Sequence, residues 1–302
     1  MRTLLSNRDA TDLAQVRRFI VGTLSTDQAE NIGETIYVDG TAGSDTFDGK
    51  SHDRAKATIA GGLAVAVAND VVAVFPGTYA EHVTMAVANV SLVGLGDVPR
   101  QVLLSDVAAV ATPYINITAQ GCCVGNLRIS PLNAANVACI QVSNVPNCLV
   151  EKCEFYIEPT GVVALDVGVR LVGAIAECFH TTIRGCIFDG HTVGILFVAN
   201  ATMPNGTLIE YNTFLNGVTC DISDGGVATA VTLVWIRYND FLGVANTTPT
   251  DYIILDQAGS TGVVSQNVFN SATHNILWIV VPATILTISN YTLAGCSVAQ
   301  VV

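Results

Sequence analysis

A short pattern of apolar and polar residues recurs through the middle and end of the chain. Six copies begin at Val124, Val150, Ile183, Ile209, Ile236 and Val264. Each has a central Asn or Cys, at positions 126, 153, 186, 212, 239 and 267, and the five later copies have Phe two residues further on. The steps between the central positions are 27, 33, 26, 27 and 28 residues. A repeat of roughly 20 to 50 residues indicates a solenoid, in which each copy forms one coil of a stack.

Apolar and polar positions alternate within each copy, as in a β-strand with one buried face. The first Val or Ile and the later Phe should therefore point inward. The residue two before the Asn or Cys is polar and should point outward; it reads Glu151, Arg184, Glu210, Arg237 and Ser265. Turn residues follow the Phe, as in Asn216-Gly217. Each copy thus predicts strand, turn and strand without a helix.

Equivalent side chains of successive coils should lie over one another, because neighbouring parallel strands are about 4.8 Å apart. We expect a phenylalanine ladder, an asparagine ladder that hydrogen-bonds along the axis, and an outward row of alternating charge. Cys153 and Cys186 should be small buried residues. Tyr211 and Tyr238 should stack, although the pattern leaves open whether they face solvent or the core. The ladder members are Phe155, Phe188, Phe214, Phe241 and Phe269, then Asn212, Asn239 and Asn267, then Glu151, Arg184, Glu210 and Arg237.

A different series of segments precedes the repeat. In order, these are Ile36-Tyr37-Val38-Asp39, Gly43-Ser44-Asp45, Asp48-Gly49, Thr58-Ile59, Val71 to Val74 and Pro76 to Glu81. The series resembles the opening of right-handed parallel β-helix proteins of the pectin-lyase-like superfamily. With the repeat, the resemblance covers about residues 35 to 295. It implies an all-β, right-handed parallel β-helix in which a short helix, here within Ala57 to Ala68, caps the first coil.

We expect two parts, an N-terminal arm at residues 1–34 and the β-helix at residues 35–302. Within the arm, Thr11 to Ile20 reads as an N-capped amphipathic helix. Its apolar side could pack on the β-helix or on a sister subunit, or it could anchor the chain in a larger assembly. The N-terminus lacks a signal-peptide core, so we expect synthesis and assembly in the cytoplasm.

Composition narrows the range of partners. The net charge is −12, and only 13 Lys and Arg residues are spread along the chain, which argues against nucleic acid. The longest apolar stretch, Ile276 to Val281, is far shorter than the roughly 20 residues of a membrane-spanning helix. The nine cysteines show no metal-site spacing. We therefore expect no nucleic acid, no membrane span and no cofactor.

Two groups of acidic residues are the candidates for chemistry. Glycosidases use two carboxyl groups about 5 to 10 Å apart, and Asp189, His191, Asp221 and Asp224 are the best cluster for such a pair. Asp39, Asp45 and Asp48 could bind calcium, although their spacing does not match the usual loop. Asp and Gly are also what tight turns require, and this interpretation is favoured for both groups.

The resemblance also bears on activity. It implies, for the family's lyases, a catalytic Arg with calcium-binding acids, and for its hydrolases Asn-Thr-Asp, Asp-Asp and Gly-His-Gly motifs. These hydrolase motifs are absent, and Gly190-His191-Thr192 is only a partial echo. A noncatalytic role is therefore favoured.

A short β-helix of this kind, with a separate arm, looks most like a bacteriophage virion structural protein. Capsid-surface decoration or cement and a head fibre are the expected types, since the chain ends with the repeat. The expected partners are two further copies in a homotrimer, other virion proteins bound through residues 1–34, and a host-surface glycan. A tail-spike-like polysaccharide depolymerase, either hydrolase or lyase, and a noncatalytic glycan-binding module are the alternatives.

Overall fold

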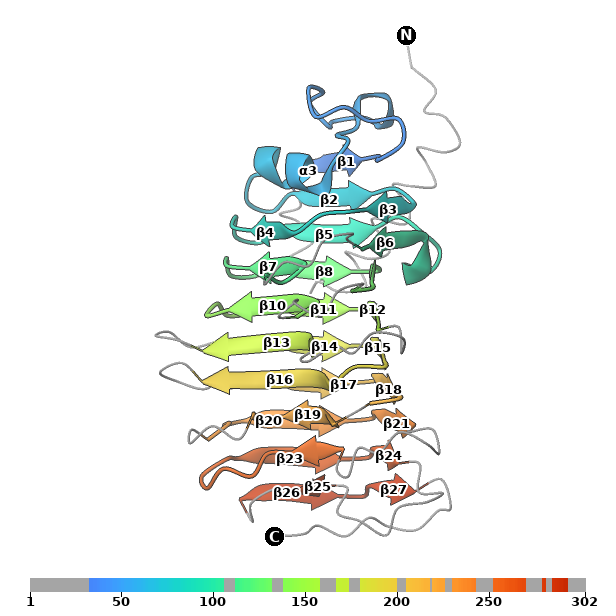
Figure 1. The fold of residues 1–302 in the computed structure, drawn as a ribbon. Coiled ribbons are helices and arrows are strands. Elements are labelled where there is room, and N and C mark those ends of the chain that lie inside the picture. The colour runs from blue at the N-terminus through green and yellow to red at the C-terminus, as the bar shows by residue number, and fades with distance from the viewer. Residues whose placement is uncertain are drawn as a thin grey trace.

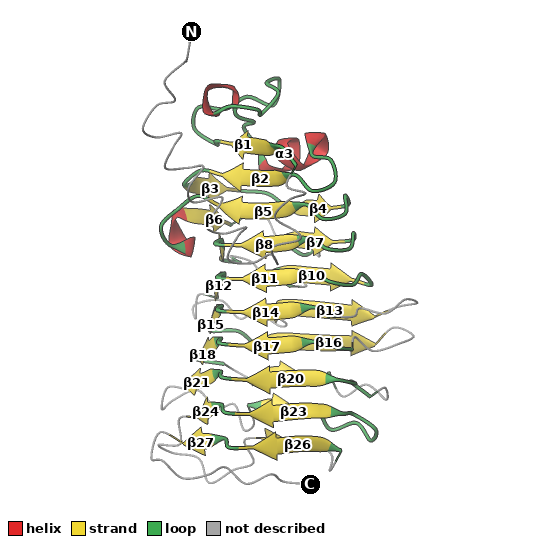
Figure 2. Cartoon of the chain, turned by 180° about the vertical axis from the view of Figure 1, so that it is seen from behind, coloured by secondary structure: helices red, strands yellow, loops and turns green. Residues whose placement is uncertain are grey.

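The chain winds into a stack of coils whose strands form three parallel sheets. The computed structural model describes residues 33–105, 112–131, 138–157, 167–173, 180–199, 205–217, 219–225, 230–242, 252–269, 279–280 and 284–292. In Figure 1 the coils follow one another from the N-terminal to the C-terminal end, and the described elements include no second layer of helices against them. The all-β, right-handed parallel β-helix that the sequence predicts is confirmed. Figure 2 shows the same stack from behind.

Sheet A has ten strands and sheet B has nine in the described part of the chain. The strands of sheet A are β1 (Thr35–Val38), β2 (Val71–Val74), β5 (Ser91–Gly94), β8 (Cys123–Gly125), β11 (Leu149–Glu151), β14 (Thr182–Arg184), β17 (Leu208–Glu210), β20 (Val234–Arg237), β23 (Gly262–Ser265) and β26 (Ile285–Ile288). Those of sheet B are β3 (Gly77–Tyr79), β6 (Val102–Leu104), β9 (Arg128–Ile129), β12 (Glu154–Tyr156), β15 (Ile187–Asp189), β18 (Thr213–Leu215), β21 (Asp240–Leu242), β24 (Val268–Phe269) and β27 (Tyr291–Thr292).

Sheet C has eight strands in that same part, and two of them are the longest in the molecule as described. They are β4 (Val83–Met85), β7 (Ile115–Ile117), β10 (Ile140–Ser143), β13 (Val167–Gly173), β16 (Val193–Ala199), β19 (Cys220–Ser223), β22 (Ile253–Ile254) and β25 (Ile279–Val280). From β2 to β25, each coil therefore contributes one strand to each sheet, and the apolar faces of all three enclose one core.

A short helix covers the first coil, as the resemblance implies. Helix α3 (Ile59–Val65) begins at Thr58, whose side chain accepts a hydrogen bond from the Gly61 N–H. It buries Ile59 and Gly62. A Cβ atom on Gly62 would come within 2.7 Å of the Val38 side chain, so the helix can approach the first strand only because this position is glycine. Two short 3-10 helices, His52–Arg54 and Pro99–Gln101, lie in connecting loops.

Phenylalanines fill the interior beneath sheet B. Phe155, Phe188, Phe214, Phe241 and Phe269 are paired in register and are all buried. The centroids of successive rings are 4.7 to 4.8 Å apart. Tyr79, Leu104 and Ile129 occupy the same column in the earlier coils. Stacking of phenylalanines along the axis therefore begins at β12, the fourth described strand of sheet B from the cap.

Asparagine amides form a second column at the bend between sheets A and B. The side-chain carbonyl of Asn239 accepts hydrogen bonds from the backbone and side-chain N–H groups of Asn212, both at 3.0 Å. Asn239 makes the same contacts with Asn267, and Asn267 makes them with Asn290. Buried Cys153 and Cys186 occupy this position in earlier coils. Asn290 does not stand out in the sequence, because its coil has Thr287 at the position of Val264.

The predicted alignment of the first copy of the repeat is wrong by one residue. Val124 pairs with Val150 and Gly125 with Glu151, so Asn126 corresponds to Lys152 and not to Cys153. Asn126 has a positive φ of 56°, as Lys152 has at 52°. Its amide donates hydrogen bonds to the carbonyls of Gly94 and Gly96 at 2.8 and 2.6 Å. An Asn in the left-handed turn is therefore easily mistaken for a ladder Asn one residue later.

Residues 1–32 lie outside the described part, and so does the predicted helix at Thr11 to Ile20. The same holds for residues 293–302. Within the described residues, the helices are too short and insufficiently apolar to cross a bilayer.

Candidate functional site

The outer edge of the bend between sheets A and B carries a column of residues in the left-handed conformation. One residue from each coil stands there, immediately before the buried Asn or Cys. The column runs Lys152, Gly185, Tyr211, Tyr238, Gln266 and Ser289, with φ between 50° and 61°. Residues other than glycine and asparagine are uncommon at such angles, and this backbone conformation costs them of order 1 kcal/mol. Tyrosine at two successive positions therefore calls for an explanation other than the turn itself.

The two tyrosines stack on each other in solvent. Their ring centroids are 5.1 Å apart and the rings are nearly parallel, at 4°. Tyr211 is 60% exposed and Tyr238 is 39% exposed. This settles the orientation that the sequence pattern left open. An exposed aromatic face is what a sugar ring or another apolar plane would contact.

A row of charged residues lies beside the tyrosines on the outer face of sheet A. Glu151, Arg184, Glu210 and Arg237 are paired in register along this sheet. The Arg184 Nε donates to Glu151 Oε2 at 2.8 Å, and the Arg237 Nε donates to Glu210 Oε2 at 2.9 Å. The Arg237 guanidinium also lies 5.9 Å from the centre of the Tyr238 ring.

The two glutamates of this row are not open to solvent as the alternation of the repeat suggests. Glu151 is 1% exposed, and Glu210 is also buried, although both lie on the outer face. The arginines are more exposed than the glutamates to which they are bound. Buried carboxylates need charge and hydrogen-bond partners, and the arginines supply them. The exposed chemistry of this row is therefore mainly cationic.

Sheet B carries another charged cluster that the sequence analysis did not identify. The Nε of Arg100 donates to both oxygens of Glu154, at 3.0 and 2.7 Å. This contact raises the pKa of the Arg100 guanidinium. Arg128 Nη1 lies 3.9 Å from Glu154, and its guanidinium sits 4.4 Å from the centre of the Tyr156 ring. Arg100 comes from a loop before the repeat, so no period connects it with Glu154.

A polar cluster on the outer face of sheet C was also missed. Arg170 Nη1 donates to Gln141 Oε1 at 3.3 Å, and Ser143 links the Gln141 amide to Asn116. Among the described residues no carboxylate pairs with Arg170, and its Nε is buried without a hydrogen-bond partner. Burial lowers the pKa of Arg170. These residues belong to three different coils and share no motif.

The four residues considered for catalysis do not form an accessible pair of acids. His191 and Asp221 are inside the β-helix, where His191 Nε2 lies 2.9 Å from Asp221 Oδ1. Burial raises the pKa of Asp221, while its contact with His191 partly opposes this. Asp224 is also buried, and only Asp189 reaches the surface, where it accepts a 2.7 Å hydrogen bond from Asn216. A polysaccharide has no route to His191 or Asp221 in this arrangement.

The carboxylates of the three residues considered as calcium ligands already accept hydrogen bonds from neighbouring groups. Asp39 accepts hydrogen bonds from the backbone of Thr41 and Ala42. Asp45 accepts from the backbone N–H groups of Ala57 and Thr58, just before α3. Asp48 is bound through both oxygens by the Nε of Arg54. Within the described ranges, no three side chains of the metal-binding types are grouped as ligands.

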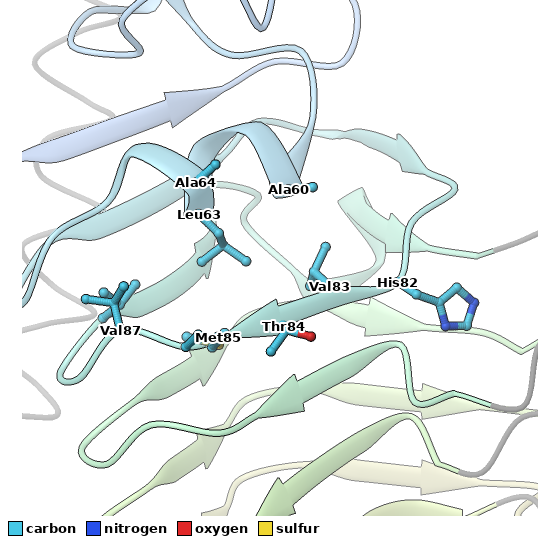
Figure 3. A pocket seen from close by; sticks show the side chains of 10 residues that line it. Ala60, Leu63, Ala64, His82, Val83, Thr84, Met85 and Val87 are labelled. Atoms are coloured by element: carbon cyan, nitrogen blue, oxygen red, sulfur yellow. The ribbon is translucent and has the colours of Figure 1, made fainter.

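A pocket lies between α3 and β4 (Figure 3). Its volume is about 390 Å³, and its walls include Leu63, Val83, Met85 and Val87. His82 and Thr84 are its polar lining residues. His82 is stacked on Tyr114 at 4.5 Å and lies 3.1 Å from the Pro113 carbonyl. Because specific binding of a polar ligand requires several convergent polar groups, this pocket is not the candidate site.

Comparisons with known proteins identify the fold but not the activity. No family model matches the sequence, and no curated protein matches it. Solved structures do match. Pectin methylesterase PemA from Erwinia chrysanthemi has a TM-score of 0.57 at 11% identity, over 89% of this chain and 92% of its own. Alginate lyase from Paenibacillus has a TM-score of 0.56 at 12% identity, over 89% of this chain and 98% of its own. Escherichia coli ybhc has a TM-score of 0.57 at 12% identity, over 97% and 95%. The chain thus has the parallel β-helix fold of these proteins.

Proposed function

We propose that this chain is a noncatalytic glycan-binding β-helix, displayed as a structural protein on the surface of a bacteriophage particle. The single observation that carries the binding function is the exposed stack of Tyr211 and Tyr238 at positive φ. The two residues keep a strained backbone and leave aromatic surface in water. Neither feature stabilises the fold, and strained residues cluster at functional sites.

The surroundings of the tyrosines suit a sugar better than an apolar partner. Arg237 supplies N–H donors 5.9 Å from the Tyr238 ring, and Arg184 and Lys152 supply others one and two coils before Tyr211. The buried glutamates hold the two arginines in place. Glycan recognition combines apolar stacking with oriented hydrogen bonds, which this surface offers together. The rigid sheet keeps the donors at fixed spacing, which limits the entropy lost on binding.

The noncatalytic part of the proposal rests on access. Hydrolysis of a glycosidic bond requires two carboxyl groups that can both reach the bond. His191, Asp221 and Asp224 are enclosed by the coils, and Glu151 and Glu210 are each bound by an arginine. Asp189 is left on the surface with an asparagine as its hydrogen-bond partner.

The virion part of the proposal rests on the resemblance described above and on the lack of the family's hydrolase motifs. It includes a homotrimer, with residues 1–34 as the attachment to other virion proteins. Light scattering should give three times the chain mass of 31.6 kDa. Removal of residues 1–34 should prevent incorporation into particles. A monomer in solution would contradict the homotrimer. Unchanged incorporation of the shortened chain would contradict attachment through residues 1–34.

Binding is tested on an array of acidic and neutral microbial oligosaccharides. We expect specific retention of one glycan class by the wild-type chain and its loss in Tyr211→Ala and Tyr238→Ala. Leu233→Ala is the matched control, because Leu233 is also exposed and also has a positive φ. Equal loss in the control, or no retention at all, would overturn the proposal. The release of reducing ends from a retained glycan would identify a depolymerase instead.

A further inference from the structure

The column of left-handed residues has a gap next to Tyr211. Lys152, Gly185 and Tyr211 stand one above another in consecutive coils, directly after the register-paired residues Glu151, Arg184 and Glu210. Gly185 has no side chain, so the space between Lys152 and Tyr211 corresponds to two coil spacings, roughly 9.6 Å. A flat ring in contact with Tyr211 on one side and the Lys152 stem on the other needs two contacts of about 3.5 to 4.0 Å, or about 7 to 8 Å in all, so the space is wide enough.

The glycine contacts show that this space is open on the tyrosine side. A Cβ atom built on Gly185 would meet only Lys152, with Cγ at 3.8 Å and the backbone nitrogen at 3.9 Å. No atom of Tyr211 lies within that range. The exposures agree: Tyr211 is more exposed than Tyr238, which has Tyr211 on one side and Gln266 in the next coil. Among the described residues, the side of the Tyr211 ring that faces Gly185 therefore has no side chain from that position of the column against it.

Charge around the gap favours an acidic ligand. Arg184 and Lys152 both lie close to Glu151, with Arg184 Nη2 at 2.7 Å and Lys152 Nζ at 3.6 Å. Both cations are more exposed than the carboxylate that they share. The Lys152 side chain is 59% exposed, so a ligand can reach its ammonium group. Charge-assisted hydrogen bonds to a ligand carboxylate are stronger than those to a neutral hydroxyl.

We propose that the gap at Gly185 is a binding subsite for one carboxylate-bearing sugar ring, which stacks on Tyr211 and places its carboxylate between Lys152 and Arg184. This subsite rests on the proposed glycan-binding function and specifies the class of sugar. Uronic and sialic acids share the required chemistry, namely a pyranose ring with one carboxylate.

The test measures binding of three probes by calorimetry: a galacturonate hexasaccharide, an α2,8-linked sialic acid hexasaccharide, and the galactose hexasaccharide that matches the first without carboxylates. We expect one acidic probe to bind at least tenfold more tightly than the neutral probe, with the difference shrinking as salt is raised. The two acidic probes distinguish the sources of the carboxylate.

Two variants address the gap itself. Gly185→Tyr should extend the stack of Tyr211 and Tyr238 and fill the subsite, since both tyrosines already adopt the same positive φ. Tyr211→Ala removes the ring and does not depend on the fit of a new side chain. Each should weaken binding of the acidic probe by about tenfold or more. Lys152→Met keeps the stem and removes the charge, and should weaken it by up to about fivefold.

The outcomes separate this subsite from the broader function. Preferential binding of the neutral probe, lost in Tyr211→Ala, would overturn the acidic class and retain glycan binding. Acidic binding that survives both Gly185→Tyr and Tyr211→Ala would overturn the subsite and place recognition elsewhere on the surface. If none of the three probes binds, the acidic subsite is overturned, and the array decides separately on glycan binding as such. Gln266→Ala, on the other side of the stack, should leave the affinity within about twofold.

Discussion

Tyr211 and Asn212 are neighbours in the sequence and lie on opposite sides of the wall of the β-helix. Asn212 belongs to an interior column in which every amide is hydrogen-bonded to the next, down to Asn290. Tyr211 belongs to an exterior column in which one ring stacks on the next and the series stops at Gly185. The two columns arise from the same repeat in the same coils.

The difference shows which positions of the repeat must keep the same residue type from coil to coil. Within an interior amide ladder, removal of one member would leave buried N–H groups of the preceding coil without acceptors. An exterior column has no such requirement, since water satisfies its polar groups. The place where the exterior column is interrupted is therefore free to bind a ligand. Replacement of interior residues should therefore lower the stability of the fold, whereas replacement of exterior residues should leave it nearly unchanged. Four substitutions test this difference.

The largest loss of stability is expected from Phe214→Ala. This ring is stacked between Phe188 and Phe241 at 4.7 and 4.8 Å and is buried. Its removal should lower the free energy of unfolding by about 3 to 5 kcal/mol, because the neighbouring rings cannot close the cavity. Urea denaturation measures the change. Leu215→Ala, at the next, outward position, should cost less than about 1 kcal/mol. Similar losses for both would mean that the interior column is not the main source of stability.

Asn239→Ala should have the next largest effect. It removes the acceptor of two N–H groups of Asn212 and the donor to the Ile209 carbonyl. Buried groups left without partners cost about 1 to 3 kcal/mol each, and partial relaxation should limit the total to about 3 kcal/mol. Thermal unfolding monitored by circular dichroism provides the measurement. A loss below about 1 kcal/mol would show that the ladder adds little beyond the backbone hydrogen bonds.

Asp221→Asn should change how stability depends on pH. Burial raises the pKa of Asp221 above its ordinary 3.8, so the folded state keeps a proton that the unfolded state releases as pH rises. The stability that this proton provides is full below pH 3.8 and is lost as pH rises toward the folded pKa. Asparagine has no such proton. The stability of the wild type relative to the variant should therefore decrease from pH 3.8 upward. Unfolding curves from about pH 3 to pH 7 test this; a relative stability that rises over that range would refute it.

Tyr211→Asn should have the smallest effect on stability. Asparagine adopts positive φ readily, and the relief of strain should offset the lost contact with Tyr238, giving a net change within about 0.5 kcal/mol. Glycan retention should nevertheless be lost. Differential scanning calorimetry and the glycan array, applied to the same preparation, check both statements. Substantial destabilisation with intact binding would assign the tyrosines to the fold rather than to recognition.

The parts of the fold that were predictable are those where chemistry repeats at equivalent positions. Phe188, Phe214 and Phe241 could be placed in one column because each is preceded by the same strand pattern. The alignment was wrong at Asn126, since an asparagine fits the left-handed turn as well as the ladder. Asn290 was missed because Thr287 and Thr292 break the apolar pattern of its coil.

The candidate site was less predictable for the same reason. The equivalence of Tyr211 and Tyr238 in the repeat indicated that they stack, but their exposure depends on the sign of φ, which the residue type does not indicate. The repeat gave no reason to single out Gly185. Arg170 with Gln141, and Arg100 with Glu154, come together from different coils and have no signal in the local sequence.

By itself, then, the sequence determined the period, the inward and outward faces and the ladders, because parallel stacking places like residues over like. Only the tertiary structure decided that Glu151 and Glu210 are buried beneath arginines, that His191 and Asp221 are enclosed, and that a glycine leaves one tyrosine face open. These features depend on which side chains cover one another across coils. Such contacts join unlike residues, so the repeat in the sequence does not reveal them.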